Sequence, residues 1–137
     1  MRRAAAVLIS GLVLATFVTV SAQLPGGSDA GKKMKNPVAP SKESVEAGKA
    51  LFQKNCRFCH GADAKGDGPT APKDSHPPNL TDDVWTHGST DGEIFAVISD
   101  GAGPKSEMKS FKSKLTPDEI WNVVNYLRSL PKGKAPR

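Results

Sequence analysis

The sequence predicts an all-α fold, because apolar residues recur at helical spacing in three separate segments. These segments lie within residues 41–56, 90–100 and 116–130. In each segment, apolar side chains stand three or four positions apart, which places them on one face of an α-helix. No strand–helix–strand pattern separates the segments, so a parallel sheet is not expected. We therefore expect one small domain of roughly three to five helices.

The first predicted helix begins near Ser41 and leads directly to the two cysteines of the chain. Ser41 or Ser44 would cap it, because a serine hydroxyl accepts a hydrogen bond from the free N–H groups of the first turn. Its apolar stripe consists of Val45, Gly48, Leu51 and Phe52. Glycine inside a helix costs about 1 kcal/mol relative to alanine, so Gly48 predicts that another helix approaches closely there.

The two later helices carry clear end signals. Ser89 or Thr90 would cap the helix over residues 90–100, and Gly101 would end it. Thr116-Pro117-Asp118-Glu119 combines a cap, a proline at the first helical position and a capping-box glutamate. The buried stripe of this last helix consists of Ile120, Val123, Val124, Leu127 and Leu130.

The most informative stretch is Cys56-Arg57-Phe58-Cys59-His60, which holds both cysteines of a 137-residue chain. The pattern C-x-x-C-H predicts covalent attachment of one haem c. Residues three apart share a face of a helical turn, so the thiols of Cys56 and Cys59 can reach the edge of one flat ligand. Each thiol can add across a vinyl group to give a thioether. His60 then offers an imidazole nitrogen as the proximal iron ligand.

Other chemistries of a C-x-x-C pair fit this sequence less well than haem attachment. A closed zinc site needs four ligands, and only His60, His76 and His87 could complete one. A thioredoxin-like redox pair belongs near a βαβ pattern, which the sequence does not show. A disulfide between residues three apart closes a small loop and stabilises little. The haem interpretation is therefore preferred.

Residues 1–22 have the pattern of an export signal. Arg2 and Arg3 form a basic start, residues 4–22 carry no charge, and Ala22 is a small residue suited to cleavage. The alternative is an uncleaved anchor, since the uncharged run approaches the ~20 residues needed to span a bilayer. Either outcome places the folded part outside the cytoplasm, and we expect a periplasmic protein.

The remaining chain divides into three parts. Residues 23–40 are rich in Gly, Pro, Lys and Ser and predict a mobile linker. Residues 41–131 form the predicted domain, and residues 132–137 form a short basic tail. The formal net charge of +5, or +3 after loss of the leader, is too modest to indicate nucleic-acid binding. Acidic residues concentrate in residues 61–100 and basic ones in 101–137, which suggests an oriented electric field.

Two loops complete the candidate haem site. Residues 61–88 are rich in glycine and proline, and a segment of this length is expected to pack against a large apolar ligand. A carbonyl within Pro77-Pro78-Asn79-Leu80 could accept the free N–H of the His60 ring. Leu80 and Trp85 would cover the haem, although Trp85 could equally be an ordinary core aromatic.

A glycine-rich loop after residue 100 presents Met108, the one methionine of the predicted domain. A thioether suits a low-spin haem iron, so Met108 is the predicted distal ligand. His87 and His76 are the lesser candidates. Four lysines lie near Met108 in the sequence and could form a docking rim for an acidic partner, or be an ordinary solvated face: Lys105, Lys109, Lys112 and Lys114.

Residues 41–131 resemble the class I monohaem c-type cytochromes, including the domain of the cbb3-oxidase subunit III type. The resemblance rests on Gly48-x-x-x-Phe52-x-x-x-Cys56 before the C-x-x-C-H motif, on Pro78-Asn79-Leu80, on Met108 with Phe111, and on Val123-Val124-Asn125-Tyr126-Leu127. It implies a cytochrome c fold in which the first and last helices cross with Gly48 against Tyr126. It also implies that the carbonyl of Pro78 holds His60. The chain departs from the family in a long segment between His60 and Pro78 and in a lysine after Met108.

The expected function is electron transfer by a haem that cycles between Fe(III) and Fe(II) with His60 and Met108 as axial ligands. Such a protein needs no general acid or base and is not expected to be an enzyme. Two alternatives remain open. The chain could be a dedicated cytochrome subunit of a dehydrogenase or a terminal oxidase, with those complexes as its redox partners. It could also be a ligand-binding or peroxidatic haem protein with a labile sixth ligand.

Overall fold

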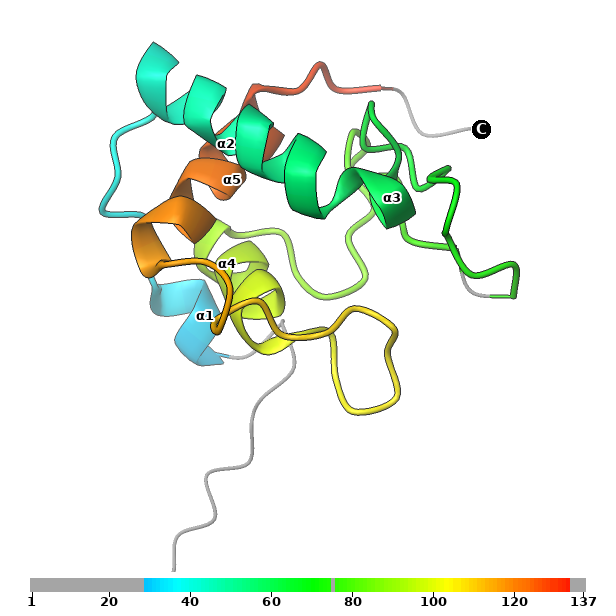
Figure 1. Ribbon diagram of the computed structural model, residues 1–137. Helices are drawn as coiled ribbons and strands as arrows, with labels where there is room; N and C mark the ends of the chain where they lie inside the picture. The colour runs from blue at the N-terminus through cyan, green and yellow to red at the C-terminus, as the bar shows by residue number, and fades with distance from the viewer. Residues whose placement is uncertain (1–28, 75, 134–137) are drawn as a thin grey trace, which may run out of the picture.

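A computed structural model gives the structure of the protein and describes residues 29–74 and 76–133. The helices of this part of the chain are α1 (Asp29–Lys33), α2 (Lys42–Asn55), α3 (Arg57–His60), α4 (Asp91–Asp100) and α5 (Pro117–Ser129) (Figure 1). No strand occurs within the described residues, and the all-α prediction is confirmed. None of the described helices is long and apolar enough to cross a membrane. The predicted signal at residues 1–22 lies outside the described residues.

The predicted end signals form as hydrogen bonds. The hydroxyl of Ser41 accepts from the N–H of Ser44 at 3.2 Å and caps α2. Thr90 and Thr116 each form a reciprocal capping box with a glutamate three residues later, and Pro117 opens α5. Because these bonds satisfy the free N–H groups of the first turn, the helix starts are fixed locally by sequence.

Helices α2 and α5 cross in direct contact at Gly48 (Figure 1). A β-carbon built at Gly48 would overlap the carbonyl of Asn122 and lie 2.9 Å from Cβ of Tyr126. Only glycine lets the two backbones come this close. The predicted close approach at Gly48 is therefore confirmed, with Tyr126 as the neighbour that the family resemblance implies.

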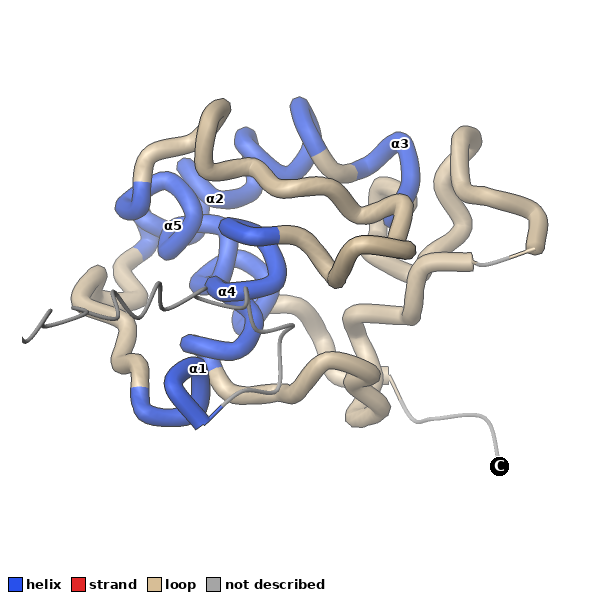
Figure 2. The backbone as a smooth tube through the Cα atoms, turned by 90° about the horizontal axis from the view of Figure 1, so that it is seen from below, coloured by secondary structure: helices blue, strands red, loops and turns tan. Residues whose placement is uncertain are grey.

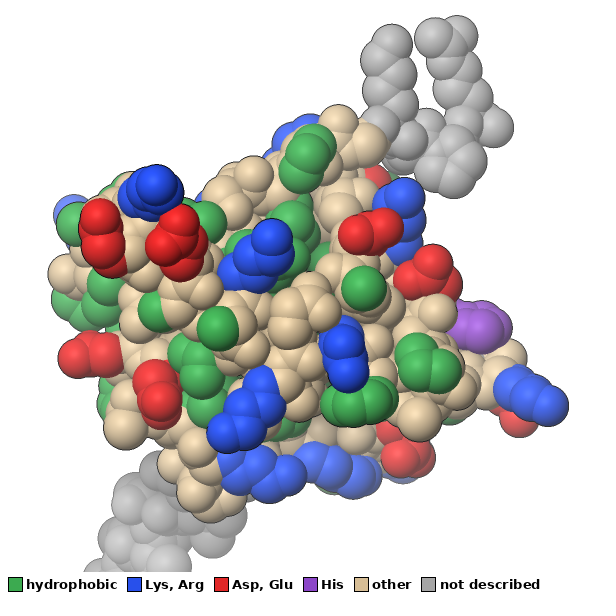
Figure 3. All heavy atoms as spheres, turned by 45° about the horizontal axis from the view of Figure 1, so that its top comes forward, with side chains coloured by type: hydrophobic (Ala, Val, Ile, Leu, Met, Phe, Trp, Pro, Cys, Tyr) green, Lys and Arg blue, Asp and Glu red, His purple; other side chains and the backbone are tan. Residues whose placement is uncertain are grey.

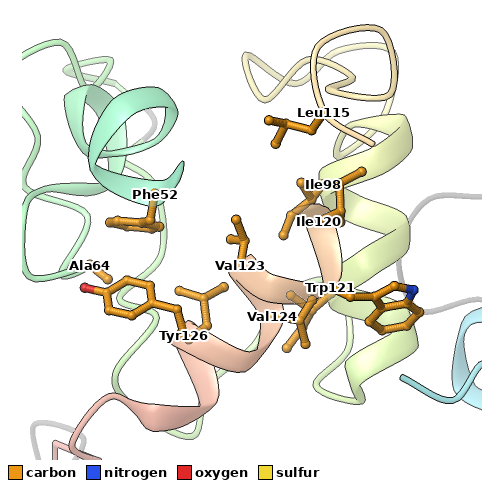
Figure 4. Packing of buried hydrophobic residues seen from close by; sticks show 11 residues of the cluster. Phe52, Ala64, Ile98, Leu115, Ile120, Trp121, Val123, Val124 and Tyr126 are labelled. Atoms are coloured by element: carbon orange, nitrogen blue, oxygen red, sulfur yellow. The ribbon is translucent and has the colours of Figure 1, made fainter. Parts of the chain in front are cut away.

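The hydrophobic core lies among α2, α4 and α5, and Figure 4 shows its side chains converging between these helices. The largest fully buried side chains are Phe52, Ile120, Val123 and Val124. The ring of Phe95 on α4 stacks on Trp121 of α5 with centroids 4.3 Å apart. The apolar stripes predicted for the three long helices thus meet in one core.

The N-terminal segment differs from the predicted linker over residues 29–40. Helix α1 packs against α4, where a β-carbon at Gly92 would lie 2.6 Å from Cβ of Met34. The side chain of Asn125 on α5 accepts a hydrogen bond from Asn36 at 2.7 Å and donates to the carbonyl of Val38 at 3.1 Å. Hydrogen bonds to the buried Asn125 therefore help to hold this segment in place. Such bonds need no apolar stripe in the segment, so its sequence did not predict them.

The long loops gather at the end of the molecule where α2 leads into α3. Figure 1 shows residues 61–80 and the yellow tip of the loop between α4 and α5 on this side, and Figure 2 shows loops beside α3 from a second direction. The backbone N–H of Gly133 donates to the carbonyl of Thr81 at 2.7 Å, so the chain after α5 returns to the first of these loops. The helices thus support a loop-built site at one end of the domain.

Candidate functional site

The motif Cys56–His60 forms one continuous helical turn at the end of α2. The N–H of Cys56 donates to the carbonyl of Phe52 at 2.8 Å, which extends α2 to the first cysteine. The N–H groups of Cys59 and His60 donate to the carbonyl of Cys56 at 3.2 and 3.0 Å. Cys56 and Cys59 are not joined to each other by a disulfide, and Cys56 is half-buried whereas Cys59 is exposed. The predicted placement of the three groups on a single turn is present.

The His60 ring lies in a largely apolar environment. It is half-buried, and its centroid lies 6.4 Å from that of Phe52. Burial lowers the pKa of His60, which favours the neutral imidazole that a metal requires. Its Nδ1 atom is buried and has no hydrogen-bond partner, the one such side-chain nitrogen or oxygen among the described residues. A buried polar atom without a partner is rare in proteins, so the ring has a place for one more ligand or for the carbonyl expected from Pro78.

The thiol of Cys56 is a poor fit to redox chemistry. Burial, followed by the charge of Cys59, raises its pKa to about 12. Catalytic C-x-x-C pairs instead hold a thiolate with a lowered pKa. No group of three or more His, Cys, Asp or Glu side chains able to hold a metal ion occurs within the described residues. The geometry therefore favours neither the redox pair nor a zinc site built from these side chains.

The loop after His60 folds back over α3 and carries the predicted Pro78-Asn79-Leu80 stretch. The N–H of Gly66 donates to the carbonyl of His60 at 2.8 Å, and the N–H of Leu80 donates to the carbonyl of Ala64 at 2.8 Å. Ala64 is fully buried and has a φ of 60°, a left-handed conformation. No hydrogen bond joins the His60 ring to Pro78 in this structure, so the orienting role expected of Pro78 stays a prediction.

Met108 lies in a loop that is closed at its neck by hydrogen bonds. The N–H of Ala102 donates to the carbonyl of Met108 at 3.0 Å, and the N–H of Phe111 donates to the carbonyl of Ile98 at 3.0 Å. Four of the predicted site residues are half-buried and pack against the same hydrophobic core: Cys56, Leu80, Trp85 and Met108. Of the lesser candidates for the distal ligand, His76 is exposed and His87 is half-buried.

Trp85 has neighbours that the sequence patterns did not indicate. Its indole N–H donates to the carbonyl of Asp82 at 3.0 Å. The guanidinium of Arg128 and the ammonium of Lys132 lie 5.9 and 5.7 Å from the ring centroid. The sequence offered one signal of these contacts, Arg128 near the end of the last helix. By itself, an arginine there predicts only a favourable interaction with the helix C-terminus.

These observations fit a covalently bound haem. Two thiols and a neutral imidazole occupy one turn, the imidazole carries a buried nitrogen without a partner, and half-buried apolar side chains come from two loops. Thioether attachment and axial ligation require this donor set.

Comparison with known families decides the identity of the fold. The family described as cytochrome c oxidase, cbb3-type, subunit III matches residues 43–127. The chain belongs to this family. It is a monohaem c-type cytochrome domain with the cytochrome c fold and covalently bound haem c, and Cys56 and Cys59 have the spacing that such attachment requires.

Curated relatives cover the same part of the chain. The cbb3-type cytochrome c oxidase subunit CcoP of Rubrivivax gelatinosus is 36% identical over 94 residues, which are 68% of this chain and 28% of the relative. The subunit FixP of Azorhizobium caulinodans is 39% identical over 111 residues, which are 74% of this chain and 34% of the relative. The chain thus spans about a third of the length of these two subunits.

Solved structures share the fold. Cytochrome cL from Methylophaga aminisulfidivorans is 32% identical, with a TM-score of 0.55 over 66% of this chain and 55% of that one. A chain of the reducing HAO-like protein complex of Kuenenia stuttgartiensis is 26% identical, with a TM-score of 0.62 over 69% of this chain and 47% of that one. The predictions of a c-type cytochrome, of haem c and of an electron-transfer role are confirmed at this level.

Proposed function

We propose that this cytochrome works as the electron-transferring subunit of a membrane-bound terminal oxidase of the cbb3 type. The observation that carries this proposal is the match of residues 43–127 to a family of oxidase subunits. Both curated relatives described above are named as subunits of such oxidases. Bound haem c supplies a one-electron couple, and the protein sets its potential through axial ligands, hydrogen bonds and burial. The partner that accepts the electron would then be the oxidase itself.

The residues of the site have distinct proposed roles. Cys56 and Cys59 hold the haem covalently, and His60 is the proximal ligand, kept neutral by its burial. Met108 is the distal ligand, on a loop whose neck is fixed to the end of α4. Leu80 and Trp85 shield the haem from water, and Pro78 orients His60. With both axial positions filled, the protein has no open site for substrate and acts as an electron carrier.

The lysines around Met108 are the proposed contact for an acidic surface of the partner. Lys105, Lys109, Lys112 and Lys114 are all exposed. The ammonium of Lys112 lies 3.4 Å from a carboxylate oxygen of Asp100, and the ammonium of Lys109 donates to the carbonyl of Ser106 at 2.8 Å. These contacts hold the two side chains near the base of the loop. Figure 3 shows that basic side chains also gather along one edge of the molecule.

A free periplasmic carrier is the second candidate. The cytochrome cL structure described above is matched by this chain over 55% of the length of cytochrome cL. Residues 1–22 have the pattern of an export signal. Cleavage of this signal would release a free carrier, and an uncleaved signal would anchor a subunit. Both candidates use the same haem site, so the distinction concerns the partner and the attachment to the membrane.

Fractionation of the host cell separates the two candidates. The chain is expressed with a C-terminal tag at its native level, and the periplasmic extract and the detergent-solubilised membranes are purified separately. We expect the tagged cytochrome to co-purify from membranes with oxygen-consuming oxidase activity. Recovery of nearly all the haem-bearing chain in the periplasmic extract, without oxidase, would contradict the subunit proposal and favour the free carrier.

A further inference from the structure

The end of α5 holds the segment that leads from the first loop into α4. This segment, residues 81–91, contains Trp85 and the cap of α4. Its carbonyl at Thr81 accepts from the N–H of Gly133, and its indole lies near the side chains of Arg128 and Lys132. The predicted basic tail thus begins with residues that contact the site loop.

Arg128 makes three contacts with this segment through one planar group. Its Nε donates to the carboxylate of Asp91 at 2.6 Å, and its Nη2 donates to the carbonyl of Ser89. The same guanidinium lies 5.9 Å from the centre of the Trp85 ring. A guanidinium can combine two directed hydrogen bonds with a contact to an aromatic face, whereas the ammonium of lysine is a point charge without this fork.

We propose that Arg128 is the positioning residue for Trp85 and holds residues 81–91 against the haem site. The proposal rests on the proposed site, because Trp85 packs against the same core as Leu80, Met108 and Cys56. The two hydrogen bonds of Arg128 fix the backbone at Ser89 and the carboxylate of Asp91. They thereby restrict the part of the loop that carries Trp85 to one conformation. Without the fork, the indole moves and water reaches the haem, which lowers its reduction potential because water stabilises the more highly charged ferric form.

Lys132 offers a matched control at the same ring. Its ammonium lies 5.7 Å from the centre of Trp85, and the ion pair that it makes with Asp83 at 3.6 Å is exposed. Exposed ion pairs contribute little to the folded state. Removing Lys132 therefore takes away a cation near the indole and leaves the hydrogen bonds of Arg128 in place.

Nuclear magnetic resonance of the reduced holoprotein tests the positioning role directly. Protein labelled with ¹⁵N-tryptophan gives two indole signals, and the W85F variant identifies that of Trp85. In R128M and R128K, we expect this signal to shift and its N–H to exchange with solvent about tenfold faster, the ratio that corresponds to one hydrogen bond to a charged group. The signal of Trp121 should stay in place, and in K132M the indole N–H of Trp85 should keep the exchange rate that it has in the unchanged protein.

Redox titration of the same variants gives the second readout. We expect R128K, which keeps the positive charge, to lower the reduction potential more than K132M, which removes one, and R128M to lower it at least as much as R128K. An R128K variant that matches the unchanged protein in both measurements would overturn the proposal, because charge alone would then suffice. An unshifted Trp85 signal in R128M would also overturn it. If the proposed haem site is wrong, the result is different: the unchanged protein would carry no covalent haem or would be high-spin. The Trp85 signal would still decide whether Arg128 positions the indole.

Discussion

Gly48 and Tyr126 meet where α2 and α5 cross, with a β-carbon built at Gly48 only 2.9 Å from Cβ of Tyr126. The ring of Tyr126 in turn lies 5.3 Å from that of Phe52, one helical turn before Cys56. The crossing therefore determines how α2 presents the haem-attachment turn to the rest of the domain.

Replacing Gly48 with alanine should destabilise the holoprotein although alanine is the better helix former. The added methyl group overlaps the backbone of Asn122, which no side-chain rotation relieves, and we expect a loss of about 1–3 kcal/mol in the free energy of unfolding. Guanidinium denaturation followed by circular dichroism measures this. The exposed neighbour Ala47 is the control, since A47G should lose only about 1 kcal/mol through helix propensity. A G48A protein as stable as the unchanged one would mean that the helices do not touch there.

Glu93 should make the start of α4 sensitive to acid. The carboxylate accepts from the N–H and the hydroxyl of Thr90 at 2.9 and 2.8 Å, and the bond from the backbone N–H of Thr90 is the main cause that lowers the pKa of Glu93 below its ordinary value of 4.5. A lowered folded-state pKa contributes stability above pH 4.5, which is lost as the pH falls through the folded-state value.

The E93Q variant tests this pH dependence. Glutamine can still accept the bond from the N–H of Thr90 but lacks the negative charge. At pH 7 we therefore expect E93Q to be less stable than the unchanged protein by about 0.3–1 kcal/mol, the range for a charge at a helix N-terminus, and the difference should vanish in strong acid. Denaturant titrations across the acid range measure it. The E46Q variant is the control, because Glu46 makes only an exposed ion pair with Lys42 at 3.9 Å. A stability difference for E93Q that does not change with pH would contradict the assigned cause.

Met108 should keep added ligands away from the haem. The M108A protein should bind carbon monoxide when reduced, because the proposed distal ligand is gone, while the unchanged protein should not. Absorption spectra before and after addition of the gas measure this. M34A is the control, since Met34 lies beside α4 at Gly92 rather than among the site residues. An unchanged protein that already binds carbon monoxide readily would favour the ligand-binding or peroxidatic alternative.

The lysines around Met108 should accelerate association with an acidic partner. Replacing Lys105, Lys109, Lys112 and Lys114 with glutamine should lower the bimolecular rate of electron transfer at low salt by about tenfold and flatten its salt dependence, because steering by exposed charges is screened. Stopped-flow mixing with the purified oxidase at rising salt concentration measures it. A K42Q variant changes charge at the start of α2, the end of that helix far from α3, and should have a smaller effect. A rate for the unchanged protein that does not vary with salt would remove the steering role.

Local rules predicted much of this fold. The starts of α2, α4 and α5 follow from serine and threonine caps, and the approach at Gly48 follows from the cost of glycine in a helix. The haem-attachment turn is readable because Cys56, Cys59 and His60 are adjacent in sequence, so their chemistry needs no knowledge of the tertiary structure.

Long-range polar contacts account for what the sequence did not predict. Asn125 holds Asn36, which is 89 positions away, and this contact orders a segment whose composition indicates a linker. Arg128 meets Ser89 and Asp91 across 39 and 37 positions. Neither contact is visible as a periodic pattern in the sequence. In each case a single polar side chain makes several directed hydrogen bonds, whereas an apolar contact would need a repeated stripe of residues.

Covalent attachment of haem to the Cys56–His60 turn is the central claim, and a haem-stained denaturing gel tests it most directly. The chain and its C56A/C59A variant are produced in a host that attaches haem to exported cytochromes, and visible spectra are recorded in both redox states. We predict that haem migrates with the unchanged chain under denaturing conditions, with the spectrum of a six-coordinate, low-spin haem, and is absent from the variant. A folded but colourless unchanged protein from that host would contradict the account.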